Sequence, residues 1–141
     1  MLWVVIPALD EADNLAALIP RVVAEVSTYA PGGRVLVVDD GSTDDTAKVV
    51  AELMAEHPAV AYESMGHNQG KAPALRRGFD RALDEGAETV AMMDADGQDD
   101  PCERSDPILA SSCLWTLGGS TKEQQRNIEF FLSPRNCRRP A

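Results

Sequence analysis

Hydrophobic residues form short continuous runs along residues 1–93, and longer amphipathic segments separate these runs. Because the runs do not alternate with polar residues, each is typical of a strand that is buried on both faces, as in a parallel sheet. The predicted strands are residues 2–6, which Pro7 ends, residues 34–38, a weaker strand at 59–63, and residues 90–93.

The first segment between strands has hydrophobic residues at the three- and four-residue spacing of an amphipathic helix. This helix is expected to reach about Tyr29, with Asp10 or Asp13 as its cap. Pro20 falls inside it and predicts either a kink or a late start, because proline lacks the N–H that an inner turn requires.

The next two segments also have helical spacing. Ser42 is the expected cap of the second helix, and Asp45 would complete a capping box. The third helix is expected at residues 72–85, where Pro73 suits the first turn and Gly86 ends the helix. Strands and helices therefore alternate, which predicts an α/β fold with a mostly parallel sheet and right-handed crossovers.

The pattern changes after Pro101. Residues 1–107 carry 8 Lys and Arg against 21 Asp and Glu, whereas residues 108–141 carry 5 against 2. The hydrophobic residues of 108–117 follow neither a helical nor a strand periodicity, and residues 121–132 fit a short helix. We therefore expect two regions, an α/β region at 1–101 and a divergent tail at 102–141. The tail's composition suggests a shifted reading frame or the end of a fragment.

Composition restricts the class of protein. A chain of 141 residues suits one domain, and its net charge of −10 argues against nucleic acid or an anionic membrane surface as a direct partner. Three widely spaced cysteines form neither a disulfide framework nor a zinc site, which favours a reduced, cytoplasmic protein. No segment has the roughly 20 apolar residues that cross a bilayer.

Acidic residues follow three of the predicted strands, at 7–11, 39–42 and 94–98. The carboxyl ends of parallel strands meet at one edge of the sheet, where ligands of such folds bind. Asp94 and Asp96 share one side of an extended backbone, so both could face one ion or phosphate. An anionic ligand there would need a divalent cation between it and the carboxylates. The alternative is an acidic loop that only caps a strand.

Other motifs fit less well. No G-x-G-x-x-G follows a strand, and residues 66–71 are one residue short of a phosphate loop, with Ala72 where Ser or Thr would bind magnesium. Lys71 still lies where it could reach a phosphate at the start of a helix. Residues 94–97 resemble the start of a calcium loop, with the glycine two positions early, and the nucleophile motif of haloacid-dehalogenase-type phosphatases, which usually lies on the first strand.

Four motifs in this order resemble the amino-terminal half of a family 2 glycosyltransferase with the GT-A fold, and they are most similar to the dolichol- or polyprenol-phosphate mannosyltransferase branch. The motifs are V-I-P-A-L-D-E at 5–11, V-V-D-D-G-S-T-D-D-T at 37–46, N-Q-G-K at 68–71 with Gly78-Phe79, and D-A-D-G-Q-D-D-P at 94–101.

The resemblance implies a nucleotide-sugar site that uses Mg²⁺ or Mn²⁺. It assigns the base and ribose to Pro7, Leu9, Glu11 and Asp40, the diphosphate to Asp94, Ala95 and Asp96, and the metal to Asp94, Asp96 and Gln98. Lys71, by its position at a helix start, joins this predicted nucleotide-sugar site. Leu9 departs from the family, because an aromatic residue often packs on the base there.

The implied reaction is metal-dependent, inverting transfer of a sugar from a GDP-mannose or UDP-glucose type of donor to a lipid phosphate or another hydroxyl. The residues that would supply the acceptor pocket and a general base have no match after Pro101, so the catalytic residues are unassigned. The alternative is a non-catalytic nucleotide-sugar-binding module or a pseudo-enzyme that acts through a partner. An uncovered sheet edge would predict self-association. In a full-length enzyme, the resemblance implies a position at the cytoplasmic membrane face.

Overall fold

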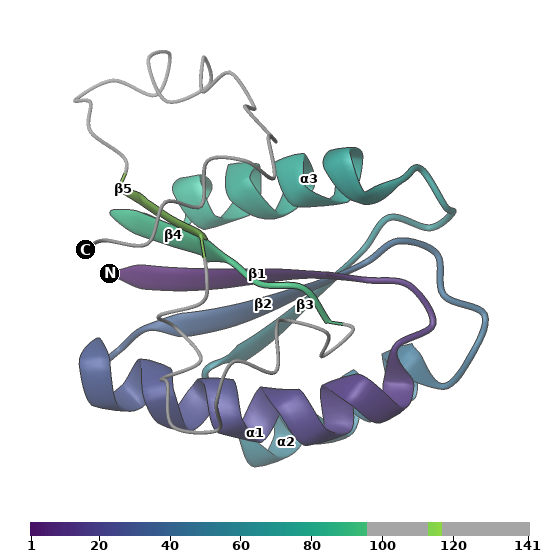
Figure 1. Cartoon of the computed structure of the whole chain (residues 1–141), viewed down its shortest axis with the longest axis horizontal. Helices are drawn as coiled ribbons and strands as arrows, with labels where there is room; N and C mark the ends of the chain where they lie inside the picture. Colours follow the sequence, from purple (N-terminus) through teal and green to yellow (C-terminus); the bar gives the residue numbers. More distant parts are fainter. Residues whose placement is uncertain (96–112, 117–141) are drawn as a thin grey trace.

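The computed structural model of the chain describes residues 1–95 and 113–116. A five-stranded sheet in the order β3-β2-β1-β4-β5 lies between helices α1 and α2 on one face and α3 on the other (Figure 1). The elements are β1 (Leu2–Ala8), α1 (Ala12–Tyr29), β2 (Arg34–Asp39), α2 (Thr46–Glu56), β3 (Val60–Ser64), α3 (Lys71–Asp84), β4 (Thr89–Met92) and β5 (Cys113–Thr116). The predicted α/β class is confirmed.

Strand β1 is the centre of the sheet and pairs in parallel with both β2 and β4. Its successive side chains enter opposite layers: Val4 and Ile6 pack with α1 and α2, whereas Trp3 and Val5 pack on the side of α3. All four are fully buried. The continuous apolar run therefore reflects burial on both faces, as predicted.

The prediction that Pro7 ends the first strand is wrong, because β1 continues to Ala8. The Val5 carbonyl accepts a hydrogen bond from the Met93 N–H at 3.1 Å, so odd-numbered β1 residues direct their backbone polar groups towards β4. The ladder with β4 has its last pair at Val5 and Met92. Pro7 lies beyond that pair, where its missing N–H breaks no ladder bond.

The predicted helix starts need two corrections. Helix α1 begins at Ala12 and continues through Pro20, so a late start is wrong, and its N-cap is Glu11 rather than Asp10 or Asp13. Helix α2 has Asp45 as its N-cap, and neither the Glu11 nor the Asp45 side chain makes a cap hydrogen bond to the backbone of its own helix. Ser42 was expected to cap α2, but its hydroxyl instead accepts a hydrogen bond from the Asp10 N–H.

Strand β5 was not predicted. It pairs antiparallel with β4 and lies in the segment 108–117, where the sequence has no clean period. Four residues are too few to display an alternation, and an added strand here means that β4 is not the edge of the sheet. The helix expected at 121–132 lies outside the described residues.

Helix α3 lies unusually close to the sheet at Gly78. A Cβ atom at this position would lie 2.4 Å from Val5 Cγ1 and 3.0 Å from Val38 Cγ2. The glycine therefore lets the helix backbone approach β1 and β2 closely. Within the described residues, no helix combines the length and apolar character needed to cross a membrane.

Candidate functional site at the carboxyl edge of the sheet

The loops after β1 and β2 are joined by hydrogen bonds. Asp10 Oδ1 accepts from the Thr43 N–H at 2.8 Å and from the Asp44 N–H at 3.3 Å, and Ser42 Oγ accepts from the Asp10 N–H at 2.9 Å. Asp10 has a φ of 53°, a left-handed conformation that aspartate tolerates better than most residues. The two loops therefore form one unit at the carboxyl edge.

The same loop after β2 satisfies the first N–H groups of helix α1. Thr46 Oγ1 accepts from the Glu11 N–H at 3.1 Å, and Asp44 Oδ2 accepts from the Ala12 N–H at 3.4 Å. The hydrogen bond from the Thr46 hydroxyl lowers the pKa of Asp44. Helix α1 is thus capped by side chains that lie more than 30 residues further along the chain.

Asp39, at the end of β2, is buried, and both of its carboxylate oxygens accept hydrogen bonds within the protein. Its Oδ1 accepts from the Ser42 N–H and its Oδ2 from the Tyr62 hydroxyl, both at 2.8 Å. Burial and this hydrogen bond to Asp39 raise the pKa of Tyr62. Asp39 therefore connects the loop after β2 to the neighbouring strand β3.

Asp40 performs the equivalent task for the loop before α3. The residue is 4% exposed, and its two carboxylate oxygens accept from the N–H groups of Gln69 at 2.8 Å and Gly70 at 2.9 Å. The two loops are in close contact here, because a Cβ on Gly41 would lie 2.6 Å from the backbone N of Asn68. This contact brings the start of α3 next to the ends of β1 and β4.

A cation and a carboxylate meet at that position. Lys71, the first residue of α3, forms an ion pair with Asp94, two residues after β4. The Lys71 side chain is 52% exposed and that of Asp94 is 33% exposed, so solvent reaches both groups. The pairing joins two of the residues that the sequence singled out.

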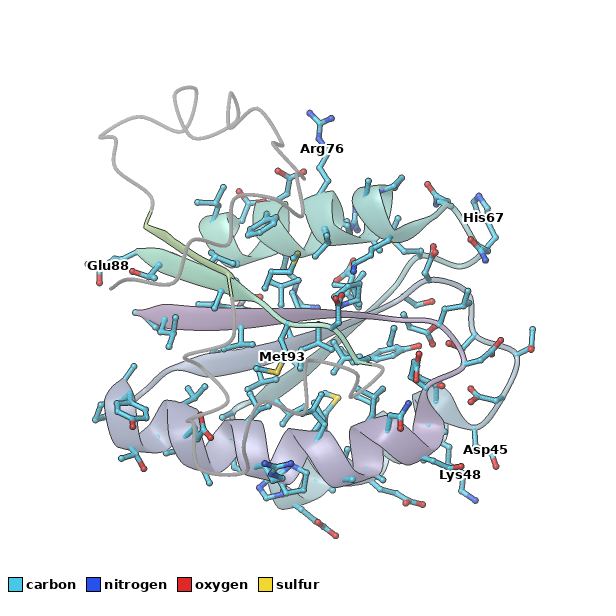
Figure 2. The ribbon with its side chains drawn as sticks, viewed as in Figure 1. Asp45, Lys48, His67, Arg76, Glu88 and Met93 are labelled. Atoms are coloured by element: carbon cyan, nitrogen blue, oxygen red, sulfur yellow. The ribbon has the colours of Figure 1, made fainter. Side chains whose placement is uncertain are left out.

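The other predicted site residues lie in different environments. Leu9 is exposed just beyond β1, Pro7 is buried, and the Glu11 carboxylate accepts from Asn14 Nδ2 at 2.6 Å. Ala95 is buried in the hydrophobic core with Met93, whose side chain points towards the α1 and α2 layer (Figure 2). Asp96 and Gln98 lie outside the described residues.

Of the three predicted metal ligands, only Asp94 lies within the described residues, and its carboxylate is an oxygen ligand of the kind that Mg²⁺ and Mn²⁺ bind. Its position suits a cation, because the Lys71 ammonium already lies against it. Within residues 1–95 and 113–116, no three acidic, histidine or cysteine side chains are grouped as a metal site. The prediction that Asp96 and Gln98 complete a metal site concerns residues outside the described part of the chain.

Sequence reasoning missed the bonds that join the loops. Asp10 was assigned to a helix cap, and its contacts with Thr43 and Asp44 depend on a fold that brings together residues 33 and 34 positions apart. The available signal was the dense run of Ser, Thr and Asp at 42–46, since such side chains bond readily to nearby backbone groups. That signal does not specify which backbone is bound.

These features define an α/β protein whose strand ends carry a group of acidic residues, with Lys71 beside them at the start of α3. The chain belongs to glycosyl transferase family 2, whose family model matches residues 3–104. The predicted membership is confirmed, and the matched region includes all four motifs.

Two relatives illustrate the similarity. An undecaprenyl-phosphate 4-deoxy-4-formamido-L-arabinose transferase of Klebsiella pneumoniae is 34% identical over 128 residues, which are 90% of this chain and 38% of that protein. A polyprenol monophosphomannose synthase of Mycolicibacterium smegmatis is 37% identical over 103 residues, which are 72% of this chain and 37% of that protein. The chain thus spans less than two fifths of the length of these relatives.

Solved structures support the same fold. The mannosyltransferase PcManGT from Pyrobaculum calidifontis, in complex with GDP-Man and Mn²⁺, superposes with a TM-score of 0.56 and 28% sequence identity. The match covers 67% of this chain and 27% of that structure. The fold is therefore of the GT-A type, as predicted, with the chain corresponding to part of the complete domain.

Proposed function

We propose that this chain is the nucleotide-sugar-binding part of a glycosyltransferase that moves a sugar from a nucleoside diphosphate donor to a lipid phosphate, with inversion at the sugar. The observation that carries the proposal is the pair formed by Lys71 and Asp94 at the carboxyl edge of the sheet. It combines a group that attracts phosphate with a carboxylate that attracts a metal ion. Relatives named as polyprenyl-phosphate sugar transferases support the choice of acceptor.

The donor would lie across the strand ends. In this proposal Pro7, Leu9 and Glu11 border the base and ribose together with the surface above Asp40. Lys71, Asp94 and Asp96 face the diphosphate, and the buried Ala95 would contribute its backbone only. Bound Mg²⁺ or Mn²⁺, held by Asp94, Asp96 and Gln98, would supply positive charge that stabilises the leaving nucleotide. Lys71 would bind a phosphate oxygen with its ammonium. The exposed side chain of Leu9 offers an apolar surface to the base.

The acceptor and the location belong to the same proposal. A polyprenyl phosphate is held in a bilayer by its hydrocarbon chain, so the complete enzyme would work at the cytoplasmic face of a membrane. In this proposal, the residues that bind the acceptor lie outside the four motifs.

Calorimetry and transfer of radiolabelled sugar test the proposal. GDP-mannose and UDP-glucose are titrated into the chain with Mn²⁺, with Mg²⁺ and with EDTA. We expect one donor to bind only with metal, and Asp94→Asn to weaken that binding by about tenfold or more, as loss of a charged contact does. Asp80→Asn is the matched control, because it makes the same substitution at an exposed aspartate on α3.

The outcomes separate enzyme from binding module. Binding with transfer to polyprenyl phosphate supports the enzyme. Metal-dependent binding without transfer supports a non-catalytic module. A folded chain that binds neither donor, with or without metal, would contradict both.

A further inference from the structure

A buried carboxylate connects the strand ends to the lysine of the site. Asp40 is 4% exposed and directs both oxygens at two successive backbone N–H groups, those of Gln69 and Gly70. Its own N–H donates to the Ala8 carbonyl at 2.8 Å, which anchors it to β1. Both carboxylate oxygens of Asp40 thus have a partner within the protein.

The bonded glycine determines where α3 begins. Gly70 is the N-cap residue, with a φ of 102° and a ψ of 165°, a conformation that L-residues with a side chain rarely adopt. Lys71 follows directly and forms its ion pair with Asp94. The series of contacts therefore runs from β2 through the Gly70 backbone to Lys71 and then to the end of β4.

We propose that Asp40 is a positioning residue that holds Gly70 so that the Lys71 ammonium stays on Asp94. This role rests on the function proposed above. In that function, the ion pair keeps a positive charge at the acidic site before the nucleotide arrives. The Asp94 carboxylate alone would repel a phosphate, and the Lys71 ammonium offsets its negative charge. When the ligand binds, the Lys71 ammonium leaves Asp94 and pairs with the phosphate. Asp40 then acts on the ligand through Lys71 rather than by direct contact with the base.

The first test needs no ligand. The folded chain is treated with an amine-acylating reagent, and the rate of modification of Lys71 is followed by mass spectrometry, with exposed Lys48 as the internal reference. An ammonium held against a carboxylate is shielded from the reagent. We expect Lys71 to be modified several-fold faster in Asp40→Asn and in Asp94→Asn, with Lys48 unchanged.

Asp39→Asn is the matched control. Asp39 is the adjacent residue, is equally buried and also accepts two hydrogen bonds, but its partners are Ser42 and Tyr62. A merely structural loss would affect both variants alike, whereas positioning affects Lys71 only in Asp40→Asn. An unchanged Lys71 rate in folded Asp40→Asn overturns the proposal, and so does an equal increase in Asp39→Asn.

A second pair of variants covers the case in which Asp40→Asn does not fold. Gly70→Ala disturbs the helix start while Asp40 stays intact, and its new Cβ would meet only Pro73 Cδ at 3.8 Å. Gly66→Ala has a similar positive φ with nothing within 4 Å. We expect faster Lys71 modification in Gly70→Ala than in Gly66→Ala, and equal rates would contradict the positioning role.

The ligand arm uses GDP and UDP with Mn²⁺ as probes. If the function is right, the nucleotide that binds shields Lys71 from the reagent, and Asp40→Asn weakens its binding by about tenfold, in line with a misplaced charged contact. Absence of nucleotide binding in the unmodified chain rejects the proposed function alone. The acylation rates without ligand still decide whether Asp40 positions Lys71.

Discussion

Gly41 and Gly66 share a φ of 80° but differ in the space around them. A Cβ on Gly41 would lie 2.6 Å from backbone atoms of His67 and Asn68, whereas nothing lies within 4 Å of one on Gly66. Alanine in the left-handed region costs about 1–2 kcal/mol of stability at either position. Because this backbone strain is common to both variants, the difference between them measures the contact between the loops.

We therefore expect Gly41→Ala to destabilise the fold by about 1–3 kcal/mol more than Gly66→Ala, the usual cost of overpacking. The free energy of unfolding in urea measures both variants. Equal losses would mean that the loops after β2 and β3 separate easily. They would also weaken the view that residue 41 holds the Asp40 carboxylate against Gln69 and Gly70.

Among single residues, prediction from sequence was best where the chemistry is local. Pro73 lies in the first turn of α3, as expected. It was weakest for Ser42 and Asp10, whose short polar side chains can bond several backbone groups equally well. Only the fold determines that Ser42 accepts from Asp10, 32 residues away, rather than capping α2.

At the scale of elements, α3 is attached to the edge strand β3 through charge. Glu63 on β3 pairs with Arg77 at 2.8 Å and with Arg81 at 2.7 Å, and its side chain is 18% exposed. Burial opposes ionisation of Glu63, but the hydrogen bonds and charges of the two arginines outweigh it, so the pKa of Glu63 is lowered.

This lowered pKa predicts an acid-dependent loss of stability. The contribution of Glu63 is fully present above its ordinary pKa of 4.5 and is lost as the pH falls through the lowered folded-state value. Urea unfolding of the wild type and of Glu63→Gln at a series of pH values between 7 and 3 measures it. We expect the stability gap between them to narrow on acidification, and a constant gap would contradict the assignment.

Elements were predictable where they are long. Helix α1 and strands β1 and β2 have enough residues to display their periods, and the order of elements implied the parallel sheet. Strand β5 has four residues and lies in a segment without a period, so its pairing with β4 depends on tertiary contacts alone. The exact start of α2 was missed because the loop before it bonds to α1 instead.

At the scale of the whole molecule, the described sheet has β3 at one end. The Val35 N–H donates to the Ala59 carbonyl, and the Met65 N–H donates to the Asp39 carbonyl, so odd-numbered residues of β3 bond to β2. The Tyr62 carbonyl must face the open edge, where Arg81 Nη1 donates to it at 2.7 Å. Arg81 therefore blocks part of an edge that could otherwise pair with a second chain.

Removal of this block is expected to promote association. Arg81→Ala should raise the fraction of dimers and larger species measured by sedimentation velocity at neutral pH. Arg76→Ala is the matched control, because Arg76 is an exposed arginine on the same helix that points away from the sheet (Figure 2). Equal sedimentation of the two variants would show that the β3 edge does not govern association.

The division at residue 101 stays a prediction. The alignment with the Klebsiella pneumoniae relative spans 128 residues, so it includes part of residues 102–141. Sequencing the source locus in all reading frames from the codon for Asp100 onward tests the proposed frame shift directly. A second frame that restores similarity to the relatives would support it, and continued similarity in the present frame would reject it.

The hydrogen bonds that close the start of α1 have a consequence for folding order. Glu11 and Ala12 donate to Thr46 and Asp44, so these two bonds can form only when the loop after β2 is in place. On a ribosome, they cannot form until residue 46 has left the exit tunnel. Deuterium exchange at the Glu11 and Ala12 amides will therefore report on the opening of a loop that is distant in the chain.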